Sequence, residues 1–500
     1  MTIMALAGVV MLAGCKKQGI ETVPSGEGAV VFTATTGGGG EKTLLYPSEN
    51  GAVKWEEGDL ILVNSSNYEL TDGASTTSGT FTLSVGSPSP ATPYCAVYPN
   101  ANGNSVTNNT TGAVSITLPA TQQLVAGSFG SGANPMVAYS ESSTSLSFKN
   151  VCGALRIKVY GTTESEYINK IVLTSTSDDL CGTYTVDATS STPTLSSASS
   201  AGKTLTLQTA SGYIRLSNDA ENPTEFYAVL PPGDYSKDDL TVTAKMNDDV
   251  VGTVTIAVDF TIERSAVTVA QTEAAEVSCG GRLPGIFSIG SGTQVYFSKS
   301  NVVRESSSGK FYFADNQYYY VGARDTYPST YLNWSTACGM ASQTIYDSDG
   351  STSCGTGWRI LTRDEWAYLI GRTVNGNTGD GGAYRRVTLT DSKDGKAGVY
   401  GLIIFPDNYT GTVPSSGASI TKTTFVNDYE SVGCVFLPAV GISYGSSVSD
   451  AGSRGYYWSS TECNGSDAYS LYFLSGGVYT DGHSNYGKAF GLSVRLVLAK

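Results

Sequence analysis

The sequence predicts a mainly β protein, with two tandem β-sandwiches followed by an α+β domain that mixes strands with at least one helix. Short apolar or alternating segments recur along the first half of the chain, and Gly, Asn, Ser and Pro separate them. Glycine occurs 58 times and charged residues make up only 15% of the chain, a composition typical of short strands joined by tight turns. No amphipathic helical segment of ten or more residues stands out in this half.

The N-terminal segment predicts an exported, lipid-anchored protein. The apolar run from Ile3 to Ala13 is too short to span a bilayer as a mature helix and fits the core of a signal peptide. It ends in Leu12-Ala13-Gly14-Cys15, which resembles a bacterial lipobox; the alternative is a chance cysteine after an apolar stretch. We therefore predict a signal peptide over residues 1–14, a lipid on Cys15 and a flexible Gly/Ser/Thr-rich tether over residues 15–40.

Two β-sandwiches are predicted over residues 41–160 and 161–280. Strand-like segments such as "YCAVYPN", "LSFKNVCGALRIKVYG" and "TEFYAVLPPGDY" occur at regular spacing in this region, as in stacked antiparallel sheets. After residues 278–285 the composition changes, because aromatic residues become denser and every tryptophan after Trp55 follows. We therefore predict a third domain over residues 281–500.

The stretch "GWRILTRDEWAYLIGR", residues 357–372, places two adjacent carboxylates, Asp364 and Glu365, between two tryptophans. They could be a catalytic acid/base pair or the first turn of a helix. Thr362 followed three residues later by Glu365 is the capping-box pattern, and a negative charge in the first turn is favoured by the helix dipole. Adjacent helical residues point about 100° apart and do not face one cleft. We therefore predict a capped helix that buries Trp366 and the apolar residues after it.

Charge and residue types exclude several classes of site. The net charge of -14 argues against nucleic-acid binding, which needs patches of Lys and Arg. The single histidine, His483, excludes a His-rich metal site and leaves one candidate for a Ser-His-Asp triad. Its Gly-rich segment, "YTDGHSNYGK", indicates a surface loop. We therefore predict no catalytic residue, no metal, no cofactor and no enzymatic activity, although a distant pair of carboxylates would also suit a glycosidase.

The cysteines beyond the lipobox are compatible with disulfides or with free thiols. No CxxC pair occurs, so zinc-ribbon and thioredoxin-type sites are excluded. Export would allow disulfides, but Cys95, Cys152 and Cys434 lie in apolar strand-like runs, where a buried thiol fits equally well. The full set is Cys95, Cys152, Cys181, Cys279, Cys338, Cys354, Cys434 and Cys463.

Several segments in order along residues 53–269 carry a family resemblance: "VKWEEGDLILV", "YCAVYPN", "ITLPATQQ", "NPMVAYS", "LSFKNVCGALRIKV", "LCGTYTVD" and "FYAVLPPGDY". Together they resemble the fimbrillin-like (Mfa-like) lipoprotein pilins of the Bacteroides group. The resemblance implies two transthyretin-like β-sandwiches and assembly with other pilins by strand addition. Pilins of this family mature by cleavage after an arginine, but the first arginine here is Arg156, inside a predicted strand. That departure and the large C-terminal domain favour a pilus tip or accessory position over a shaft position.

The C-terminal third carries a second set of segments: "GIFSIGSGTQVYFSKSNV", "YLNWSTACG", "GWRILTRDEWAYLIGR", "GLIIFPDNY", "VFLPAVGI", "YYWSST" and "AYSLYF". They resemble the repeat domain of Fibrobacter and Bacteroides surface proteins, which is related to C-type-lectin-like folds. The Glu-Pro-Asn, Gln-Pro-Asp and Trp-Asn-Asp tripeptides of calcium-dependent lectins are missing. "FPDN", residues 405–408, comes nearest and lacks the first ligand. Calcium-dependent sugar binding is therefore not predicted.

These observations predict a surface-exposed lipoprotein of the outer membrane, acting as a pilus tip or accessory adhesin. The C-terminal lectin-like domain would bind a glycan or a host surface protein, through Tyr318 and Tyr320 of "NQYYYVG" and Tyr456 and Tyr457 of "GYYWSS". The alternative for these tyrosines is that alternate residues of two strands point into the core. The alternative function is a glycan-binding lipoprotein outside any pilus, working beside a polysaccharide uptake system.

Overall fold

The computed structural model describes residues 30–36, 44–46, 52–318, 330–390, 398–445, 447–481 and 485–500. Strands dominate these residues, and the first helix among them is α1 (Trp334–Cys338). The predicted mainly β fold class is therefore confirmed. No helix in the described ranges has the length and apolarity needed to cross a membrane. Cys15, Tyr320 and His483 lie outside these ranges, so what the sequence predicts for them stays a prediction.

The first unit is a closed barrel. Its strands, in sheet order, are β1 (Phe32–Thr36), β13 (Ser145–Asn150), β12 (Met136–Ser140), β7 (Tyr94–Tyr98), β4 (Leu60–Val63), β5 (Ser66–Asp72) and β6 (Ser78–Leu83). β1 pairs in parallel with β13 and antiparallel with β6, so these strands close on themselves instead of forming the two separate sheets of a sandwich. Trp55 is fully buried in the core, edge-on to Phe81, Tyr98 and Phe148 at 4.9 to 5.6 Å between ring centroids.

The middle unit takes strands from both sides of residue 160. Its strands are β8 (Ser105–Asn108), β9 (Ala113–Leu118), β10 (Thr121–Val125), β11 (Ser128–Phe129), β14 (Gly153–Gly161), β15 (Tyr167–Ile168), β16 (Lys170–Ser175), β17 (Cys181–Asp187), β18 (Ser196–Gly202), β19 (Thr204–Gln208), β20 (Ile214–Arg215), β21 (Thr224–Leu230), β22 (Gly233–Tyr235), β23 (Leu240–Met246), β24 (Asp249–Val254), β25 (Phe260–Ile262), β26 (Val267–Val269) and β27 (Ala275–Val277). β9 pairs with β17 and β10 with β19. Strand pairing therefore crosses the predicted division at residue 160, and a shared core joins barrel and middle unit. A separate hairpin, β2 (Leu44–Tyr46) and β3 (Ala52–Lys54), lies apart from these sheets.

The C-terminal domain mixes sheets and short helices. Its elements are β28 (Arg282–Gly290), β29 (Thr293–Arg304), β30 (Phe311–Phe313), α1, β31 (Ile345–Tyr346), α2 (Arg363–Gly371), β32 (Thr373–Val374), β33 (Asn377–Thr378), β34 (Tyr384–Thr390), β35 (Val399–Ile404), β36 (Ala418–Thr421), α3 (Lys422–Thr424), β37 (Val435–Pro438), β38 (Ile442–Tyr444), β39 (Ser447–Ser449), β40 (Gly455–Glu462), β41 (Asp467–Leu474), β42 (Gly477–Tyr479), β43 (Asn485–Gly487) and β44 (Arg495–Ala499). β29 is central, since it pairs with β28, β30 and the C-terminal β44. The described part of the domain also contains two four-stranded sheets, around β35 and around β41, and two hairpins, β32-β33 and β38-β39.

The predicted capped helix is α2, and its capping box is present in full. The Thr362 hydroxyl accepts a hydrogen bond from the Glu365 N–H at 3.1 Å, and the Glu365 carboxylate accepts from the Thr362 N–H at 2.8 Å. Trp366 and Leu369 are buried against β28 and its neighbours. The Asp364 side chain is 85% exposed. The two carboxylates therefore face different surroundings, as the helical interpretation predicts.

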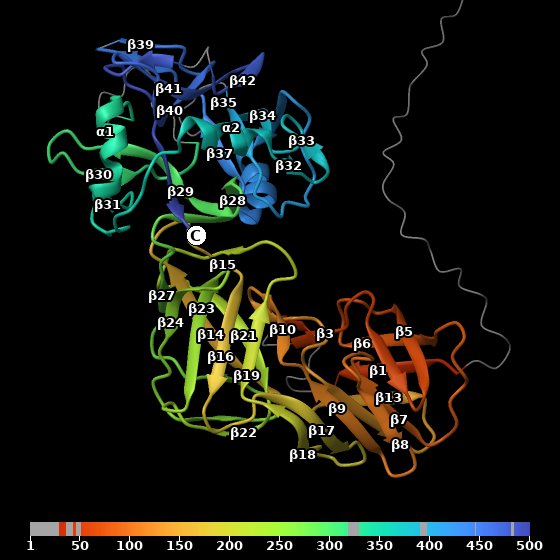
Figure 1. Ribbon diagram of the computed structural model, residues 1–500. Helices are drawn as coiled ribbons and strands as arrows, with labels where there is room; N and C mark the ends of the chain where they lie inside the picture. The colour runs from red at the N-terminus through yellow and green to blue at the C-terminus, as the bar shows by residue number, and fades with distance from the viewer. Residues whose placement is uncertain are drawn as a thin grey trace, which may run out of the picture.

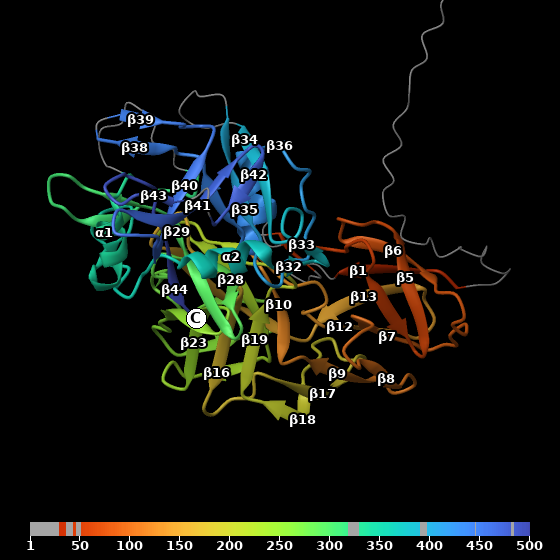
Figure 2. The ribbon, with the colours of Figure 1, turned by 45° about the horizontal axis from the view of Figure 1, so that its top comes forward.

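The C-terminal domain sits directly on the end of the middle unit, away from the barrel (Figures 1 and 2). An ion pair of 2.9 Å joins Arg282 of β28 to Asp249 of β24. The Tyr213 N–H donates to the Ser431 carbonyl at 2.9 Å. Tyr296 of β29 belongs to the core of the middle unit. The two parts therefore share a continuous interior at their junction.

A buried polar network lies at the same junction. Lys299 forms an ion pair with Asp347, and both side chains are almost completely buried. The Lys299 ammonium also donates to the Thr163 hydroxyl of the middle unit at 3.2 Å. That hydroxyl donates to Glu166 at 3.1 Å, and Glu166 accepts the Cys279 N–H at 2.5 Å. This chain of contacts couples the C-terminal domain to the loop after β14.

Candidate ligand-binding surfaces of the C-terminal domain

Tyr456 and Tyr457 lie in the interior of the C-terminal domain. They are adjacent in β40, so their rings point to opposite faces and join different core clusters. Tyr456 is 3% exposed and Tyr457 is 0% exposed. The Tyr457 hydroxyl donates to the Pro438 carbonyl at 2.8 Å, and the Tyr456 hydroxyl donates to Asp450 at 2.6 Å. Burial raises the pKa of both hydroxyls. The core interpretation fits both residues, because neither ring offers a free face to a ligand.

Tyr318 is half-buried beside a helical segment of residues 422–432, which begins with α3 and ends before β37. Its ring lies edge-on to Phe425 at 6.4 Å, and the Lys422 ammonium lies 4.5 Å from its centroid. Burial, followed by the negative charge of Glu430, raises its pKa. Phe425 and Lys422 therefore already contact the Tyr318 ring. With Tyr320 outside the described residues, a role for this pair in ligand binding stays a prediction.

A row of tyrosines crosses the sheet formed by β40, β41, β42 and β43. Tyr456 faces Tyr472 across β40 and β41, and Tyr472 faces Tyr479 across β41 and β42. Their rings stack at 5.0 and 5.8 Å between centroids. Tyr486 of β43 lies edge-on to Tyr456 at 5.2 Å. Tyr472, Tyr479 and Tyr486 are half-buried, so this row, called the aromatic face below, reaches solvent.

Polar and aromatic groups extend the aromatic face. Asp450, which accepts from Tyr456, also pairs with Arg454 at 3.4 Å, and both side chains are partly exposed. Tyr444 is 42% exposed, and Phe490 lies against its ring at 4.5 Å between centroids. Burial and then the nearby hydroxyls of Tyr472 and Tyr444 raise the pKa of Tyr486 to about 12. The row therefore continues toward the hairpin of β38 and β39.

The sequence did not single out Tyr472, Tyr479 or Tyr486 as candidate site residues. They lie in three separate strands, and the sequence does not show which strands lie side by side. The row appears only when the register of three strands is known. Two of its four members come from a hairpin, β41 and β42, whose Gly-containing turn was the local signal available.

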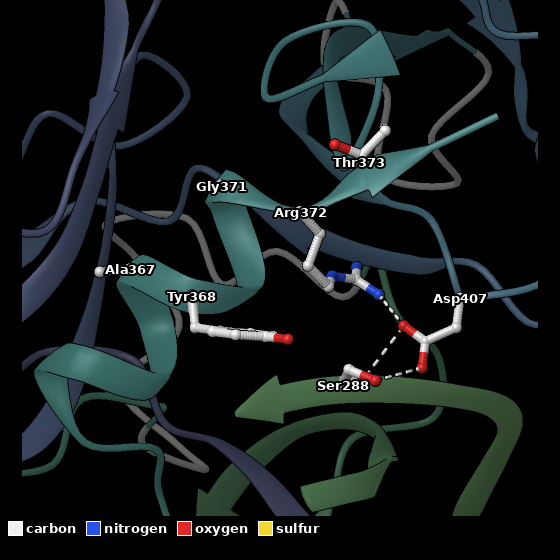
Figure 3. A pocket seen from close by; sticks show the side chains of 7 residues that line it. All are labelled: Ser288, Ala367, Tyr368, Gly371, Arg372, Thr373 and Asp407. Carbon is white, nitrogen blue, oxygen red and sulfur yellow. Dashed lines mark hydrogen bonds and ion pairs between the residues drawn. The ribbon is translucent and has the colours of Figure 1, made fainter. Parts of the chain in front are cut away.

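A cavity of about 520 Å³ opens between α2 and β28 (Figure 3). We call it the α2 pocket; its lining residues are Ser288, Ala367, Tyr368, Gly371, Arg372, Thr373 and Asp407. Tyr368 is 45% exposed, whereas the Arg372 side chain is only 6% exposed. One wall is therefore an accessible aromatic ring, and the opposite wall is an ion pair in which Arg372 is buried and Asp407 is partly exposed.

Asp407 of the "FPDN" segment is the anion of that pair. Its carboxylate accepts the Ser288 N–H at 3.0 Å, the Ser288 hydroxyl at 2.7 Å, the Gln294 amide at 3.0 Å and the Arg372 guanidinium at 2.5 Å. Burial raises the pKa of Asp407, but these hydrogen bonds and the Arg372 charge outweigh burial and leave the pKa lowered. The carboxylate is thus occupied by protein donors, which explains "FPDN" without a calcium ion.

The cysteines and acidic residues do not form a second kind of site in the described residues. All eight described cysteines are free thiols, and Cys95, Cys152 and Cys434 are buried. Of the two alternatives left open by the sequence, disulfides or free thiols, the structure has free thiols. Within the described ranges, no group of three or more His, Cys, Asp or Glu side chains could hold a metal ion. The candidate surfaces are therefore the aromatic face and the α2 pocket.

Comparison with known proteins gives one family match. Residues 409–497 match a domain of unknown function, DUF8237, a range that contains the whole aromatic face. No curated protein matches the chain.

Several solved structures are similar to parts of the chain. One candidate cell adhesion protein from Bacteroides uniformis is 15% identical, with a TM-score of 0.29, and the match covers 50% of this chain and 96% of that chain. Another from Bacteroides ovatus has the same identity and TM-score over 49% of this chain and 93% of that chain. A fimbrial protein from Bacteroides ovatus is 11% identical, with a TM-score of 0.26, over 94% of this chain and 99% of that chain. TM-scores of this size do not establish a shared fold.

Proposed function

We propose that the protein is a fimbrillin-like surface lipoprotein that acts as a pilus tip or accessory adhesin, with its C-terminal domain binding a glycan or a host surface protein. The observation that carries the proposal is the position of the aromatic face. It lies on the sheet of β40 to β42, at the end of the C-terminal domain remote from the middle unit and the barrel (Figures 1 and 2). A lipid on Cys15 would hold the opposite end of the chain at the outer membrane.

The chemistry of the aromatic face suits recognition. Tyrosine offers a large rigid ring with a polar end, which is why it is favoured at binding surfaces. Cross-strand aromatic pairs also stabilise a sheet, by about 0.2–1 kcal/mol per pair. Stability alone does not require hydroxyl groups or the partly exposed Asp450–Arg454 pair beside the row. The combination of three partly exposed rings, those of Tyr472, Tyr479 and Tyr486, with charged groups supports a binding role.

Contact with other pilins would use strand addition. β18 forms one edge of the sheet β18-β17-β9-β8, and its sequence, SSASSAG, has no charged residue or proline. Edge strands without such residues are open to pairing with another chain. We place a neighbouring pilin at this edge, on the opposite part of the molecule from the aromatic face.

The binding role is tested with Tyr479→Ala and Tyr486→Ala in the full chain. Each change removes one half-buried ring at the margin of the row, so binding to a glycan array and to host cells should fall by about tenfold. Tyr139→Ala in β12 removes a half-buried tyrosine from the barrel and is the matched control, with binding unchanged. Unchanged binding by both folded variants of the aromatic face would contradict the proposal. Binding is expected to persist in EDTA, because the Asp407 carboxylate of "FPDN" already accepts hydrogen bonds from Ser288, Gln294 and Arg372 and is not expected to bind calcium.

The position in a pilus is tested separately. Immunogold labelling of purified, sheared pili is expected to place the protein at tips or at scattered accessory positions. If the protein binds glycans but is missing from pili, the alternative function applies: a glycan-binding lipoprotein working beside a polysaccharide uptake system. The aromatic face would serve either role.

A further inference from the structure

The α2 pocket presents three different walls around one space. Tyr368 of α2 exposes its ring on one side, and Figure 3 shows this ring lying across the space from Arg372 and above Ser288. Gly371 contributes no side chain, and a Cβ added there would meet no atom within 4 Å. The volume of about 520 Å³ falls within the range of about 300–1,000 Å³ usual for small-molecule sites.

Arg372 is held rigidly but is not fully used. Its Nε donates to the Leu369 carbonyl at 3.0 Å, Nη1 to Asp407 at 2.5 Å and Nη2 to the Phe405 carbonyl at 2.7 Å. The Phe287 ring lies 5.4 Å from the guanidinium carbon. A guanidinium has five N–H groups, so two of them have no partner among the described residues. The three hydrogen bonds hold the guanidinium in place, so these two N–H groups have fixed directions.

The charge of the pocket is balanced. Arg372 and Asp407 neutralise each other, and the Asp407 carboxylate already accepts four hydrogen bonds. A ligand carboxylate attracted to Arg372 would be repelled by Asp407. A ligand ammonium attracted to Asp407 would be repelled by Arg372. The other polar side chains of the pocket are neutral hydroxyls. The Ser288 hydroxyl donates to Asp407 at 2.7 Å, the Thr373 hydroxyl shares a hydrogen bond with Thr378 at 2.9 Å, and the third hydroxyl belongs to Tyr368. The pocket therefore offers an aromatic surface and several hydrogen-bonding groups, without a net charge.

We propose that the α2 pocket binds a single neutral pyranose ring. The C–H face of the sugar would pack on the Tyr368 ring. Its hydroxyls would accept from the spare N–H groups of Arg372 and donate to the Ser288 hydroxyl oxygen, whose own proton is given to Asp407. This site differs in place and chemistry from the aromatic face, since it lies between α2 and β28 and has one exposed aromatic ring beside an ion pair. It does not depend on the proposed adhesin function.

The test uses the full chain and saturation-transfer difference NMR with glucose, galactose, mannose and N-acetylglucosamine at millimolar concentration. Glucuronate and glucosamine are the charged counterparts. Tyr368→Ala removes the stacking surface and should weaken binding of the neutral sugar at least about tenfold. Tyr368→Phe keeps the ring and should retain binding within about threefold, the loss of one hydroxyl contact. Tyr368 is 45% exposed, so neither change should prevent folding.

A second pair of variants compares an added side chain at the pocket with the same change elsewhere. Gly371→Leu places a side chain into the open space and is expected to abolish saturation transfer. Gly233→Leu in β22 is its matched control, because Gly233 is also exposed at an element terminus and its added Cβ also meets nothing within 4 Å. Loss of binding in Gly371→Leu with retention in Gly233→Leu supports the site. The proposal is overturned if no neutral sugar binds, if only the charged sugars bind, or if Tyr368→Ala and Gly371→Leu bind as the wild type does.

Discussion

At the scale of single residues, carboxylates near the candidate surfaces are committed to structural contacts. Glu365 accepts from the Thr362 N–H and forms two hydrogen bonds with Arg359, at 2.7 and 2.8 Å. Its role could be predicted, because the capping pattern spans only three residues of sequence. The role of Asp407 could not, since its partners Ser288 and Gln294 lie more than a hundred residues away along the chain.

Glu365→Gln is expected to show a pH-dependent loss of stability. Gln can keep the capping hydrogen bond but loses the charge that pairs with Arg359. Burial raises the pKa of Glu365, and the bonds from Arg359 and Thr362 outweigh burial, so its folded-state pKa is lowered below the ordinary 4.5. The ionic contribution is therefore complete above that ordinary value and is lost as pH falls through the lower folded-state pKa.

Urea unfolding of both proteins between pH 7 and pH 3 measures this difference. The free energies of unfolding of wild type and Glu365→Gln should converge in acid. Thr362→Ala is the control, because it removes a neutral cap and should cost about 0.5–2 kcal/mol without that convergence. A Glu365→Gln penalty that stays constant down to pH 3 would show that the charge contributes nothing.

At the scale of elements, strand register determines which side chains lie next to each other, and this could not be predicted from the sequence. The alternation within β40 sends Tyr456 and Tyr457 to opposite faces, which the alternative interpretation of the sequence already contained. The row of Tyr456, Tyr472 and Tyr479 needs three strands in one register. The closure of the barrel likewise depends on β1 meeting both β13 and β6, far away in sequence. Local patterns therefore predicted the strands, while their neighbours depend on long-range packing.

Gly433 lies at a close approach between two elements of the C-terminal domain. It ends the helical segment before β37 with a φ of +88°, and an added Cβ would lie 2.6 Å from Gly285 Cα in β28. Gly433→Ala should therefore destabilise the domain by more than about 1 kcal/mol. Gly417→Ala has a similar positive φ but open space around its Cβ, so it should show the smaller backbone cost alone. Equal penalties in chemical denaturation would mean that the contact between the two elements relaxes.

At the scale of the whole molecule, the C-terminal domain and the middle unit share an interior that composition did not reveal. The change in composition near residue 281 predicted a separate domain. The structure places Tyr296 in the core of the middle unit and Lys299 against Thr163. The orientation of the aromatic face relative to the rest of the chain is therefore set by packing rather than by a free linker. A surface fixed in this way keeps one direction relative to the barrel, which the proposed adhesin function would require.

Lys299→Met tests that coupling. The Lys299–Asp347 pair is almost completely buried, and removing one partner leaves the other charge without compensation, at a cost of about 3–5 kcal/mol. Because the lysine also contacts Thr163, the loss should lower the unfolding temperature of the middle unit and the C-terminal domain together, as one calorimetric transition.

The double change Lys299→Met with Asp347→Leu replaces the pair by apolar groups and should recover most of the stability. Lys237→Met, at an exposed ion pair, should leave the transition nearly unchanged. A separate, unshifted transition for the middle unit in Lys299→Met would show that the two parts unfold independently and that the junction does not fix the direction of the aromatic face.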